Sequence, residues 1–552
     1  MAQEQLDVLV VGGGIVGAGT ALDAVSRGLS TALVEQRDYA SGTSSRSSKL
    51  VHGGLRYLEM LDFALVREAL QERGLLLQHL APHLVRPVPF LYPLHHTWER
   101  PYVGAGLLLY DGMAAVGSGF DMGVPRHRHL MRRGLARLAP DLRTDDLVGA
   151  IRYYDCQVDD ARLVMDIART AADFGAHMAS RTKVIDFLRE GDRVVGARVE
   201  DLENDREIEV RAQVVVNAGG VWTNEVQEML GGRGALDVEA SKGVHLVVPR
   251  DRIRSECGFI TRTETSVLFV IPWGRHWIIG TTDTPWELDL AHPAASRRDI
   301  DYVLENVNKI LRTPLDHADV EGVYAGLRPL LRGATEPTSK ISREHTVAVP
   351  SPGLVMIAGG KLTTYRVMAR DAVDAAAPFV ADGATPSITD RVPLVGAAGF
   401  ETRTNQRVAL ARASGLDVAQ VDHLLGRHGG LVDEVLELIA ARPELAQPLP
   451  GGEDYLSAEV VYAVTHEGAR HLDDVLCRRT RLSIETFDRG TLAARPAAEL
   501  MAGELDWDAA RLEEEVDHYL RRVEAERQSQ EMLTDQEADE ARVRAPEGPW
   551  AV

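Results

Sequence analysis

The amino-acid sequence predicts an α/β protein with a parallel sheet around the N-terminus, an antiparallel sheet further along and a helical domain after it. Three observations lead to this fold class. The chain opens with a strand, a glycine turn, a helix and a second strand; residues 241–334 alternate apolar and polar side chains; and helical periodicity dominates after Pro378. With 552 residues the chain is long enough for two or three domains, because single cores seldom exceed about 250–300 residues.

The opening unit is the most informative part of the chain. Residues 7–11 are a short run rich in Val and Leu, the segment 12–17 (GGGIVG) follows at once, and a helical pattern continues to Arg27. A second apolar run over residues 31–34 ends at Glu35. Strand, glycine turn, helix and strand in this order form the unit from which parallel sheets are built.

Later segments are expected to complete the two sheets and the helical domain. The runs Val210 to Val216 and Leu354 to Ala358 are each followed by two glycines, so we expect one sheet to collect strands from distant parts of the chain. Residues 241–334, punctuated by Gly and Pro, predict an antiparallel sheet with one covered face. Helical patterns are present over residues 405–413, 418–428, 432–441 and 460–464.

Composition excludes several classes of protein. The chain carries 61 basic and 82 acidic residues, a formal charge of −21, which argues against nucleic acid as a partner because phosphate binding needs clustered Lys and Arg. Cys156, Cys257 and Cys477 are too few and too widely spaced for a disulfide framework or a Cys-based zinc site, so we expect a reducing, cytoplasmic compartment and no metal. The N-terminus lacks the pattern of a signal peptide, and no window reaches the roughly 18–20 apolar residues of a transmembrane helix.

The glycine turn predicts a dinucleotide site. In the spacing Gly12-x-Gly14-x-x-Gly17, the first glycine allows a tight turn, the second lets the backbone approach a pyrophosphate and the third lets the helix pack against the sheet. Glu35, 23 residues after Gly12, is spaced to accept hydrogen bonds from ribose hydroxyls. Its carboxylate would repel a 2′-phosphate, which favours FAD or NAD over NADP.

FAD is preferred over NAD because of what surrounds this turn. The motif begins within the first dozen residues, and a segment rich in Ser, Thr and Gly, residues 41–57, follows the second strand. Its hydroxyls and glycine amides could line a second part of an extended cofactor. The alternative interpretation of this segment is a polar surface loop.

Six motifs occur together in this chain and in a fixed order. They are Ser44 to Leu58 (SSRSSKLVHGGLRYL), Ser241 to His245 (SKGVH), Gly280 to Asp283 (GTTD), Gly326 to Leu330 (GLRPL), Gly359 to Tyr365 (GGKLTTY) and Asp473 to Leu482 (DDVLCRRTRL). The set closely resembles the FAD-dependent, quinone-linked glycerol-3-phosphate dehydrogenases, over about residues 5–520. The resemblance implies oxidation of sn-glycerol 3-phosphate to dihydroxyacetone phosphate by hydride transfer to flavin N5, with electrons passed to a quinone.

The resemblance also implies the domain organisation: an FAD-binding fold of the D-amino-acid-oxidase type, a substrate domain on an antiparallel sheet and a C-terminal helical domain. The expected FAD domain comprises residues 1–85, 150–240 and 335–385; the substrate domain 86–149 and 241–334; and the helical domain 390–523. Residues 524–552 hold eight acidic and three basic residues, so we expect this tail to be disordered.

A phosphate dianion needs cations, and four lie in the matching motifs or beside them. Arg donates two parallel hydrogen bonds to phosphate from its planar fork, and Lys acts as a point charge. Taken singly each would be read as a solvated surface charge. The expected substrate-binding residues are Arg56, Tyr57, His245, Arg328, Arg343 and Lys361.

His245 is expected to abstract the hydroxyl proton or to stabilise the developing alkoxide. It lies between Gly243 and an apolar run, and the ordinary pKa of histidine suits proton transfer near neutral pH. A half-buried structural histidine is the alternative. His52 is the second choice, or else a flavin contact. Lys361 and Thr363 are expected near the pyrimidine edge of the flavin, so the predicted catalytic residues are His245, Arg328 and Lys361.

The remaining cofactor contacts follow from the glycine turns and the resemblance. Asn217-Ala218-Gly219-Gly220 is similar to the second glycine turn of such folds, and Val184 falls where they contact adenine. The expected cofactor-binding residues are Gly12, Gly14, Gly17, Glu35, Thr43, Ser44, Ser45, Lys49, Leu50, His52, Gly53, Gly54, Val184, Ala218, Gly219, Gly360, Lys361, Leu362 and Thr363.

The expected partners are the substrate, a quinone, the inner face of the cell membrane and a second copy of the chain. Residues 98–110 combine Trp98, Tyr102 and leucines, and residues 126–137 carry five arginines, a combination that suits a headgroup interface. Core packing beside a basic loop is the alternative. The run Arg478-Arg479-Thr480-Arg481 could cap helices, bind the FAD domain or contact a second copy.

Three other functions were weighed against this one. A glycerol-3-phosphate oxidase would pass the electrons to oxygen and form hydrogen peroxide. A sequence alone does not show whether oxygen can reach the flavin. An amine or amino-acid oxidase is disfavoured by the phosphate-competent cations. A flavin-binding scaffold without turnover is disfavoured by the presence of Arg328, Arg343, Lys361 and His245.

Overall fold

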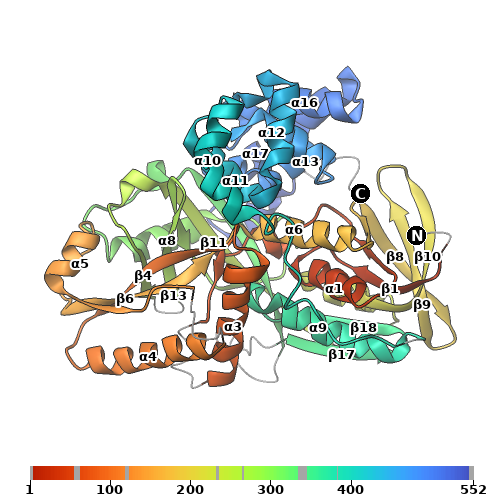
Figure 1. Cartoon of the computed structure of the whole chain (residues 1–552), viewed down its shortest axis with the longest axis horizontal. Helices are drawn as coiled ribbons and strands as arrows, with labels where there is room; N and C mark the ends of the chain where they lie inside the picture. The colour runs from red at the N-terminus through yellow and green to blue at the C-terminus, as the bar shows by residue number, and fades with distance from the viewer. Residues whose placement is uncertain are drawn as a thin grey trace.

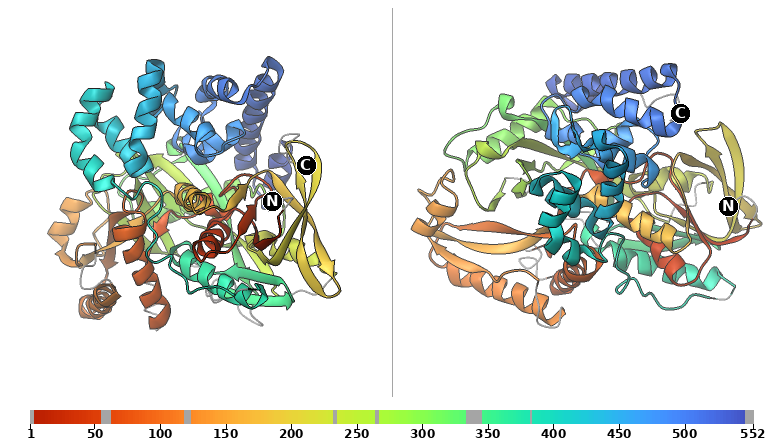
Figure 2. Two further views of the ribbon diagram at one scale, coloured as in Figure 1. Left: turned by 45° about the vertical axis from the view of Figure 1, so that its right-hand side comes forward. Right: turned by 45° about the horizontal axis from the view of Figure 1, so that its top comes forward.

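The computed structural model describes residues 4–54, 62–117, 123–231, 235–263, 267–332, 345–381 and 383–545. Figure 1 shows two sheet-containing regions side by side, with the C-terminal helices above the place where they meet. Figure 2 shows the same stacking from two further sides.

The first sheet has the strand order β17-β18-β10-β1-β2-β7. β1 (Leu6–Val11), β2 (Thr31–Val34), β7 (His177–Ala179), β10 (Arg206–Asn217) and β18 (Leu354–Gly359) run parallel, and β17 (His345–Ser351), β8 (Thr182–Glu190) and β9 (Arg193–Asp201) add antiparallel pairs. The β1 residues Val8 and Leu9 are fully buried, as expected for a parallel strand covered on both faces. The predicted collection of distant strands into one sheet is confirmed.

Helices cover this sheet and connect its strands. α1 (Ile15–Ser26) packs against α6 (Asp160–Asp173) and α9 (Tyr365–Ala376), and α7 (Thr223–Glu228) follows β10. The apolar face of α1 consists of small residues such as Ala18 and Ala21, both without exposed surface, which lets the helix lie close to its neighbours.

The second sheet has the order β15-β11-β14-β13-β12-β4-β6-β3, with β16 on β11 and β5 on β6. Its strands are β3 (Leu50–Val51), β4 (Arg86–Leu94), β5 (Arg128–Met131), β6 (Gly149–Gln157), β11 (Val238–Pro249), β12 (Gly258–Arg262), β13 (Val267–Trp273), β14 (His276–Gly280), β15 (Thr284–Trp286) and β16 (Gly322–Leu331). All pairs are antiparallel except β12 with β4. The antiparallel prediction for residues 241–334 is therefore confirmed within the described residues.

The predicted domain boundary at residue 150 is wrong for this sheet. β6 and the short β3 were assigned to the FAD domain, but both hydrogen-bond in the second sheet, where β6 pairs with β4 along nine residue positions. The chain thus crosses between the two sheets more often than composition reveals. The remaining helices of this region are α3 (Phe63–Leu75), its π-helical extension Leu76–Leu80, α4 (Glu99–Gly117), α5 (Arg132–Leu138) and α8 (Arg297–Asn308).

The C-terminal domain is helical, as predicted. It comprises α10 (Phe400–Ser414), α11 (Val418–His428), α12 (Val432–Ala441), the hairpin β19 (Pro448–Leu449) and β20 (Gly452–Leu456), α13 (Ser457–Thr465), α14 (Leu472–Asp474), the π-helical turn Val475–Arg479, α15 (Leu482–Glu485), α16 (Thr491–Leu505), α17 (Ala509–Glu531) and α18 (Asp535–Arg542).

The basic run 478–481 attaches this domain to the FAD domain. Both terminal nitrogens of Arg479 contact the two carboxylate oxygens of Asp38, at 2.7 and 2.8 Å. Arg481 reaches Asp160 at 2.6 Å, and all of these side chains are buried. Buried charges of this kind are tolerated only when paired and hydrogen-bonded. Of the three roles left open for this run, contact with the FAD domain is the one confirmed.

The prediction of a disordered tail is wrong for residues 524–545. α17 extends to Glu531, and α18 follows with a capping box between Thr534 and Glu537. Asp535 Oδ1 lies 2.6 Å from Nζ of Lys242, which is itself fully buried in β11. The tail is ordered because it supplies a carboxylate to a buried cation of the substrate domain, a partner that local composition does not reveal. Residues 546–552 lie outside the described residues.

Candidate functional site

A cavity lies between the two sheets at the carboxyl end of the parallel strands. It encloses about 1060 Å³, counting space open to solvent. This is the position at which open α/β sheets bind ligands, because the strand ends and helix N-termini meet there. Its lining residues are Ile15, Thr43, Ser44, Arg46, Ser47, Ser48, Leu50, His52, Gly243, His245, Gly326, Leu327, Arg328, Pro329, Leu330, Gly359, Gly360, Lys361, Leu362 and Thr363.

The first glycine turn has the tight geometry that its spacing predicts. Gly12 has φ +108°, and a Cβ there would lie 2.8 Å from the carbonyl oxygen of Ala218. A Cβ on Gly17 would overlap the carbonyl oxygen of Gly12. At the N-terminus of α1, Ser44 Oγ accepts the Ile15 N–H at 2.9 Å. The turn therefore offers backbone and a helix N-terminus to a pyrophosphate.

Glu35 is held over this turn by backbone donors. Its carboxylate accepts the N–H groups of Gly13 at 2.6 Å and Arg37 at 2.7 Å. Burial is the largest influence on its pKa and raises it, and the two N–H groups oppose this. The carboxylate is thus fixed at the end of β2, where a ribose contact is predicted.

The second glycine turn lies directly beside the first. Ala218, at the end of β10, donates its N–H to the carbonyl of Val11 at 2.9 Å. Gly219 donates to the side-chain oxygen of Asn217 at 3.0 Å. Val184 lies in β8 and packs in the core with residues of β1 and β2. Roles for Ala218, Gly219 and Val184 toward the cofactor stay predictions, and Ala218 and Gly219 lie against Gly12 of the turn that would hold it.

His245 projects from β11 into the cavity wall. Its Nε2 lies 2.9 Å from Ser48 Oγ, and its ring stacks on Tyr324 with centroids 4.8 Å apart. Burial lowers the pKa of His245 well below its usual range, and the cations Arg328 and Lys49 lower it further. The ring is therefore neutral near pH 7 and able to accept a proton.

Arg328 provides a cation next to this histidine. It lies on β16 opposite Ser241 of β11, and its guanidinium contacts Asp283 at 3.3 Å and Thr281 Oγ1 at 3.1 Å. Gly243 makes room for it, since a Cβ there would collide with the guanidinium group. The side chain is a quarter exposed, so it can meet a ligand in the cavity.

The turn after β18 brings Lys361 and its neighbours to the same cavity. Gly359 and Gly360 have φ of +81° and +75°, which redirects the chain into the short helix Leu362–Thr364. Thr363 Oγ1 accepts the N–H of His52 at 3.2 Å. The predicted residues Thr43, Ser44, Leu50, His52, Gly360, Lys361, Leu362 and Thr363 thus line one cavity with His245 and Arg328.

The predicted cofactor residues Ser45, Lys49, Gly53 and Gly54 do not line this cavity. Lys49 is fully buried, and its Nζ pairs with Asp160 at 2.7 Å and with the Ser45 carbonyl at 3.1 Å. Gly53 donates its N–H to the Tyr110 hydroxyl at 3.0 Å, and Gly54 turns the chain with φ +72°. A cofactor contact of these residues stays a prediction.

Three predicted substrate residues, Arg56, Tyr57 and Arg343, lie outside the described residues.

Sequence reasoning missed several residues of the site. Ser48 contacts His245, and Thr281 and Asp283 orient Arg328. All three occur in the motifs, but nothing in a serine-rich segment tells which hydroxyl meets the histidine. Tyr324, which stacks on His245, comes before the motif on the same strand.

The donor set of this cavity fits FAD. Ser44, which accepts the Ile15 N–H directly after the glycine turn, and the hydroxyls that follow it up to Ser48, which contacts His245, form a cradle along the wall of this cavity. Within the part of the chain that the structure describes, no group of three or more His, Cys, Asp or Glu side chains could hold a metal ion.

Comparisons with known proteins agree with this reading. Residues 7–366 match the family described as FAD dependent oxidoreductase, and residues 387–512 match the C-terminal domain of alpha-glycerophosphate oxidase. The chain is 57% identical over 548 residues to the Mycobacterium tuberculosis protein named glycerol-3-phosphate dehydrogenase 2, covering 99% of this chain and 93% of that one. It is 38% identical over 539 residues to the human mitochondrial glycerol-3-phosphate dehydrogenase, covering 93% and 72% of the two chains.

A solved structure extends the similarity to three dimensions. The glycerol-3-phosphate dehydrogenase from Bacillus halodurans, complexed with FAD, is 31% identical with a TM-score of 0.78, and 95% of each chain is covered. A cradle that fits FAD, a matching oxidoreductase family and relatives aligned over nearly the whole chain lead to one assignment. This chain belongs to the family of FAD-dependent glycerol-3-phosphate dehydrogenases, with FAD as its cofactor.

Proposed function

We propose that this protein oxidises sn-glycerol 3-phosphate to dihydroxyacetone phosphate and passes the electrons through FAD to a quinone. The observation that carries the proposal is the grouping of a neutral His245 with the cations Arg328 and Lys361 around one cavity at the end of the dinucleotide fold. A secondary alcohol with a phosphate group needs this combination of a base and fixed positive charge.

Each described side chain has a role in the proposed reaction. His245 accepts the proton of the C2 hydroxyl, and Ser48 holds the imidazole in place. Arg328 binds the phosphate dianion, and Arg56, Tyr57 and Arg343, outside the described residues, stay predicted partners in this binding. Lys361 adds a positive charge beside the substrate and the flavin. Bound FAD supplies flavin N5 as the acceptor of the hydride from C2.

A dehydrogenase is proposed rather than an oxidase. The relatives that are 57% and 38% identical over most of this chain carry the name dehydrogenase. The L-alpha-glycerophosphate oxidase of Mycoplasma pneumoniae is 15% identical with a TM-score of 0.53, a likeness of fold alone. We infer that the electron acceptor is a lipid-soluble quinone.

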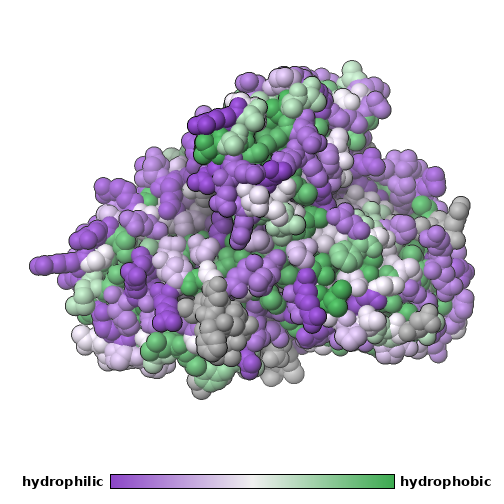
Figure 3. Space-filling model, in the orientation of Figure 1, coloured by the Kyte–Doolittle hydropathy of each residue, from purple (hydrophilic) through white to green (hydrophobic). Residues whose placement is uncertain are grey.

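A lipid-soluble acceptor leads to a proposed contact with the inner face of the cell membrane. α4 and the segment before it expose Trp98, Tyr102 and Leu108, each by more than three-fifths of its surface. Hydrophobic surface is visible in Figure 3 at the lower left, the region where Figure 1 labels α4. The arginines Arg128, Arg132 and Arg133 are exposed close by in sequence. Aromatic, apolar and basic side chains together favour a peripheral headgroup contact.

No helix within the described ranges has the length and apolar character needed to span a bilayer. A second copy of the chain also stays a predicted partner.

An anaerobic absorbance titration tests the function. We expect the flavin band of the purified protein to bleach on addition of sn-glycerol 3-phosphate and to be unchanged by glycerol or D-alanine. Reoxidation of the bleached protein by a soluble quinone should be much faster than by air. Bleaching without quinone reoxidation would leave the oxidase function, and an unchanged band would reject the substrate.

A further inference from the structure

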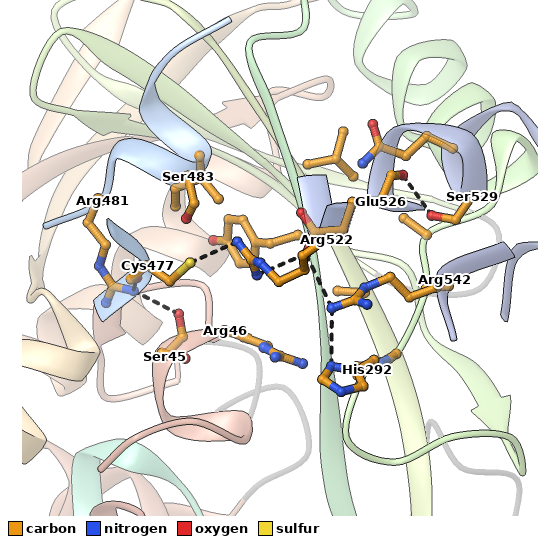
Figure 4. Close-up of a pocket in the computed structure, with 18 of the residues that line it drawn as sticks. Ser45, Arg46, His292, Cys477, Arg481, Ser483, Arg522, Glu526, Ser529 and Arg542 are labelled. Carbon is orange, nitrogen blue, oxygen red and sulfur yellow. Dashed lines mark hydrogen bonds and ion pairs between the residues drawn. The ribbon is translucent and has the colours of Figure 1, made fainter. Parts of the chain in front are cut away.

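A second cavity lies behind the cofactor segment, against the C-terminal helices (Figure 4). It encloses about 750 Å³, counting space open to solvent as for the first cavity, and has room for several water molecules. Its walls come from Ser45 and Arg46, the loop before α8, strand β16, the 477–484 region, α17 and α18. Its charged or titratable lining residues are Arg46, His292, Tyr324, Cys477, Arg478, Arg481, Arg522, Glu526 and Arg542.

The positive charge of this cavity is only partly neutralised. Arg478 and Arg481 are paired with aspartates of the FAD and helical domains. Arg522 contacts Asp473 at 2.9 Å and Glu526 at 3.1 Å. Glu526 also forms an ion pair with Arg542, at the longer distance of 3.7 Å.

Arg46 has no carboxylate within ion-pair distance among the residues that the structure describes. Its guanidinium donates to the carbonyl of Ala291 at 3.3 Å. Burial lowers the pKa of Arg46 to about 10, and the next cause is repulsion from Arg542. Glu526 is thus shared between Arg522 and Arg542, and Arg46 has no carboxylate of its own among the described residues. Burial of these cations costs free energy, which a further anion would offset.

The side chains are arranged to meet one ligand. Figure 4 shows Arg46 and Arg542 pointing toward the His292 ring, whereas Arg522, in the wall of the same cavity, points toward Cys477. Arg542 Nη2 lies 3.1 Å from His292 Nδ1, and the Arg542 side chain is almost completely buried. Guanidinium forks of this kind match the oxygens of tetrahedral oxyanions, which they bind with paired hydrogen bonds.

We propose that this cavity binds one small tetrahedral oxyanion of the phosphate class through Arg46, Arg522 and Arg542. The ligand is inorganic phosphate or the phosphate group of a small monoester. The site is distinct from the substrate cations, because Arg328 and Lys361 line the other cavity. Arg46 lines both cavities, and it precedes by two residues the Ser48 that contacts His245.

The position of the proposed anion site predicts how anion binding changes the stability of the protein. The anion joins α17 and α18 to the segment that carries the cofactor-side hydroxyls. A ligand that binds the folded state alone raises its stability in proportion to the logarithm of ligand concentration. Phosphate should therefore raise the thermal midpoint of the FAD-loaded protein more than chloride at equal ionic strength.

Equilibrium dialysis with radiolabelled inorganic phosphate tests the site on the FAD-loaded protein at constant ionic strength. The variant Arg328→Met, impaired in the substrate cavity, should retain one bound phosphate. Arg542→Met added to it should weaken this binding at least tenfold, and Arg542→Lys should restore part of it. Arg544→Met is the matched control, since it removes the same charge from an exposed position two residues away.

Three outcomes would overturn the proposal. They are loss of all phosphate binding in Arg328→Met, unchanged binding after Arg542→Met, and equal loss in Arg544→Met. If Arg542→Met does not fold, crystals of the parent protein soaked in tungstate decide the question: an anomalous peak between Arg46 and Arg542 supports the site, and its absence rejects it. Competition by glycerol 3-phosphate against labelled phosphate in Arg328→Met distinguishes a monoester ligand from inorganic phosphate.

Discussion

Ser48 Oγ and His245 Nε2 lie 2.9 Å apart, although 197 residues separate them in the chain. The contact joins the hydroxyl-rich segment after η1 (Thr43–Ser45) to strand β11 of the second sheet. Tyr324 completes the arrangement, since its ring stacks on His245 and its hydroxyl donates to the Ser47 carbonyl at 2.9 Å. The orientation of the imidazole thus depends on the segment that lines the cofactor cradle.

We expect Ser48→Ala to lower kcat about tenfold with little change in KM, because the imidazole loses its hydrogen bond but keeps its place on Tyr324. His245→Gln should lower kcat by about 10²–10⁴-fold. Steady-state assays with a soluble quinone measure both. Ser48→Thr keeps the hydroxyl and should restore most of the rate. A Ser48→Ala variant with normal kcat and weakened FAD binding would assign Ser48 to the cofactor instead.

We expect the rate of flavin reduction to fall in acid solution with an apparent pKa below 6.5. Burial, Arg328 and Lys49 lower the pKa of His245, so the ring stays neutral and able to accept a proton at pH values where free histidine is charged. Arg328→Met removes a cation and should move the apparent pKa toward neutral pH. Rapid-mixing measurements of the flavin reduction rate at low substrate concentration from pH 4.5 to 8, about the range where histidine titrates, decide this. An apparent pKa at or above 6.5 in the parent protein would contradict the base assignment.

The same shift affects stability. The unfolded chain binds a proton at His245 near pH 6.5, whereas the folded chain binds it only at lower pH. The unfolded state therefore holds more protons between these two values, and this contribution to stability falls as pH decreases through them.

The parts of this structure that sequence predicts well are those set by local pattern. The glycine turn, Glu35 and the strand ends at 217 and 359 follow from spacing that only one backbone geometry satisfies. Side-chain direction in the segment 43–52 does not follow, because Lys49 has φ +55° and turns its side chain into the core toward Asp160. A run of hydroxyls carries no periodicity that would reveal such a turn.

Long-range pairing explains the two predictions that were wrong. The pattern of β6 does not reveal its place in the second sheet, because its partner β4 lies more than 50 residues earlier along the chain. The acidic composition of the tail predicts disorder, yet its acidic residues meet cations of distant elements, as Asp535 meets Lys242. Neither partner is visible from the segment alone.

Asp535→Ala should loosen the tail. Lys242 would keep Asp299 at 2.6 Å but lose a second carboxylate, at a cost of about 1–2 kcal/mol. We expect faster proteolysis within residues 524–545 and a lower urea midpoint. Glu540→Ala, on an exposed position of the same helix, is the control and should change neither. If the tail resists proteolysis equally in both variants, apolar contacts such as that of Ala538 hold it in place.

Substitution of two similarly exposed leucines distinguishes membrane attachment through α4 from a general effect of surface hydrophobicity. Leu108 and Leu492 are exposed to a similar degree, 65% and 61%, but lie on α4 and on α16 of the helical domain. Leu108→Asp should reduce the vesicle-bound fraction about tenfold, since one leucine contributes roughly 1.5–3 kcal/mol of apolar burial. Flotation with vesicles that contain anionic lipid and quinone measures this binding.

Activity separates the attachment from the catalytic site. Leu108→Asp should retain full turnover with a soluble acceptor and lose it with quinone held in vesicles, because only the second acceptor requires the protein to meet the bilayer. Leu492→Asp should behave as the parent protein in both assays. If the parent protein does not float, or if the two variants lose binding equally, α4 is not a membrane contact, and its exposed residues would then require another partner.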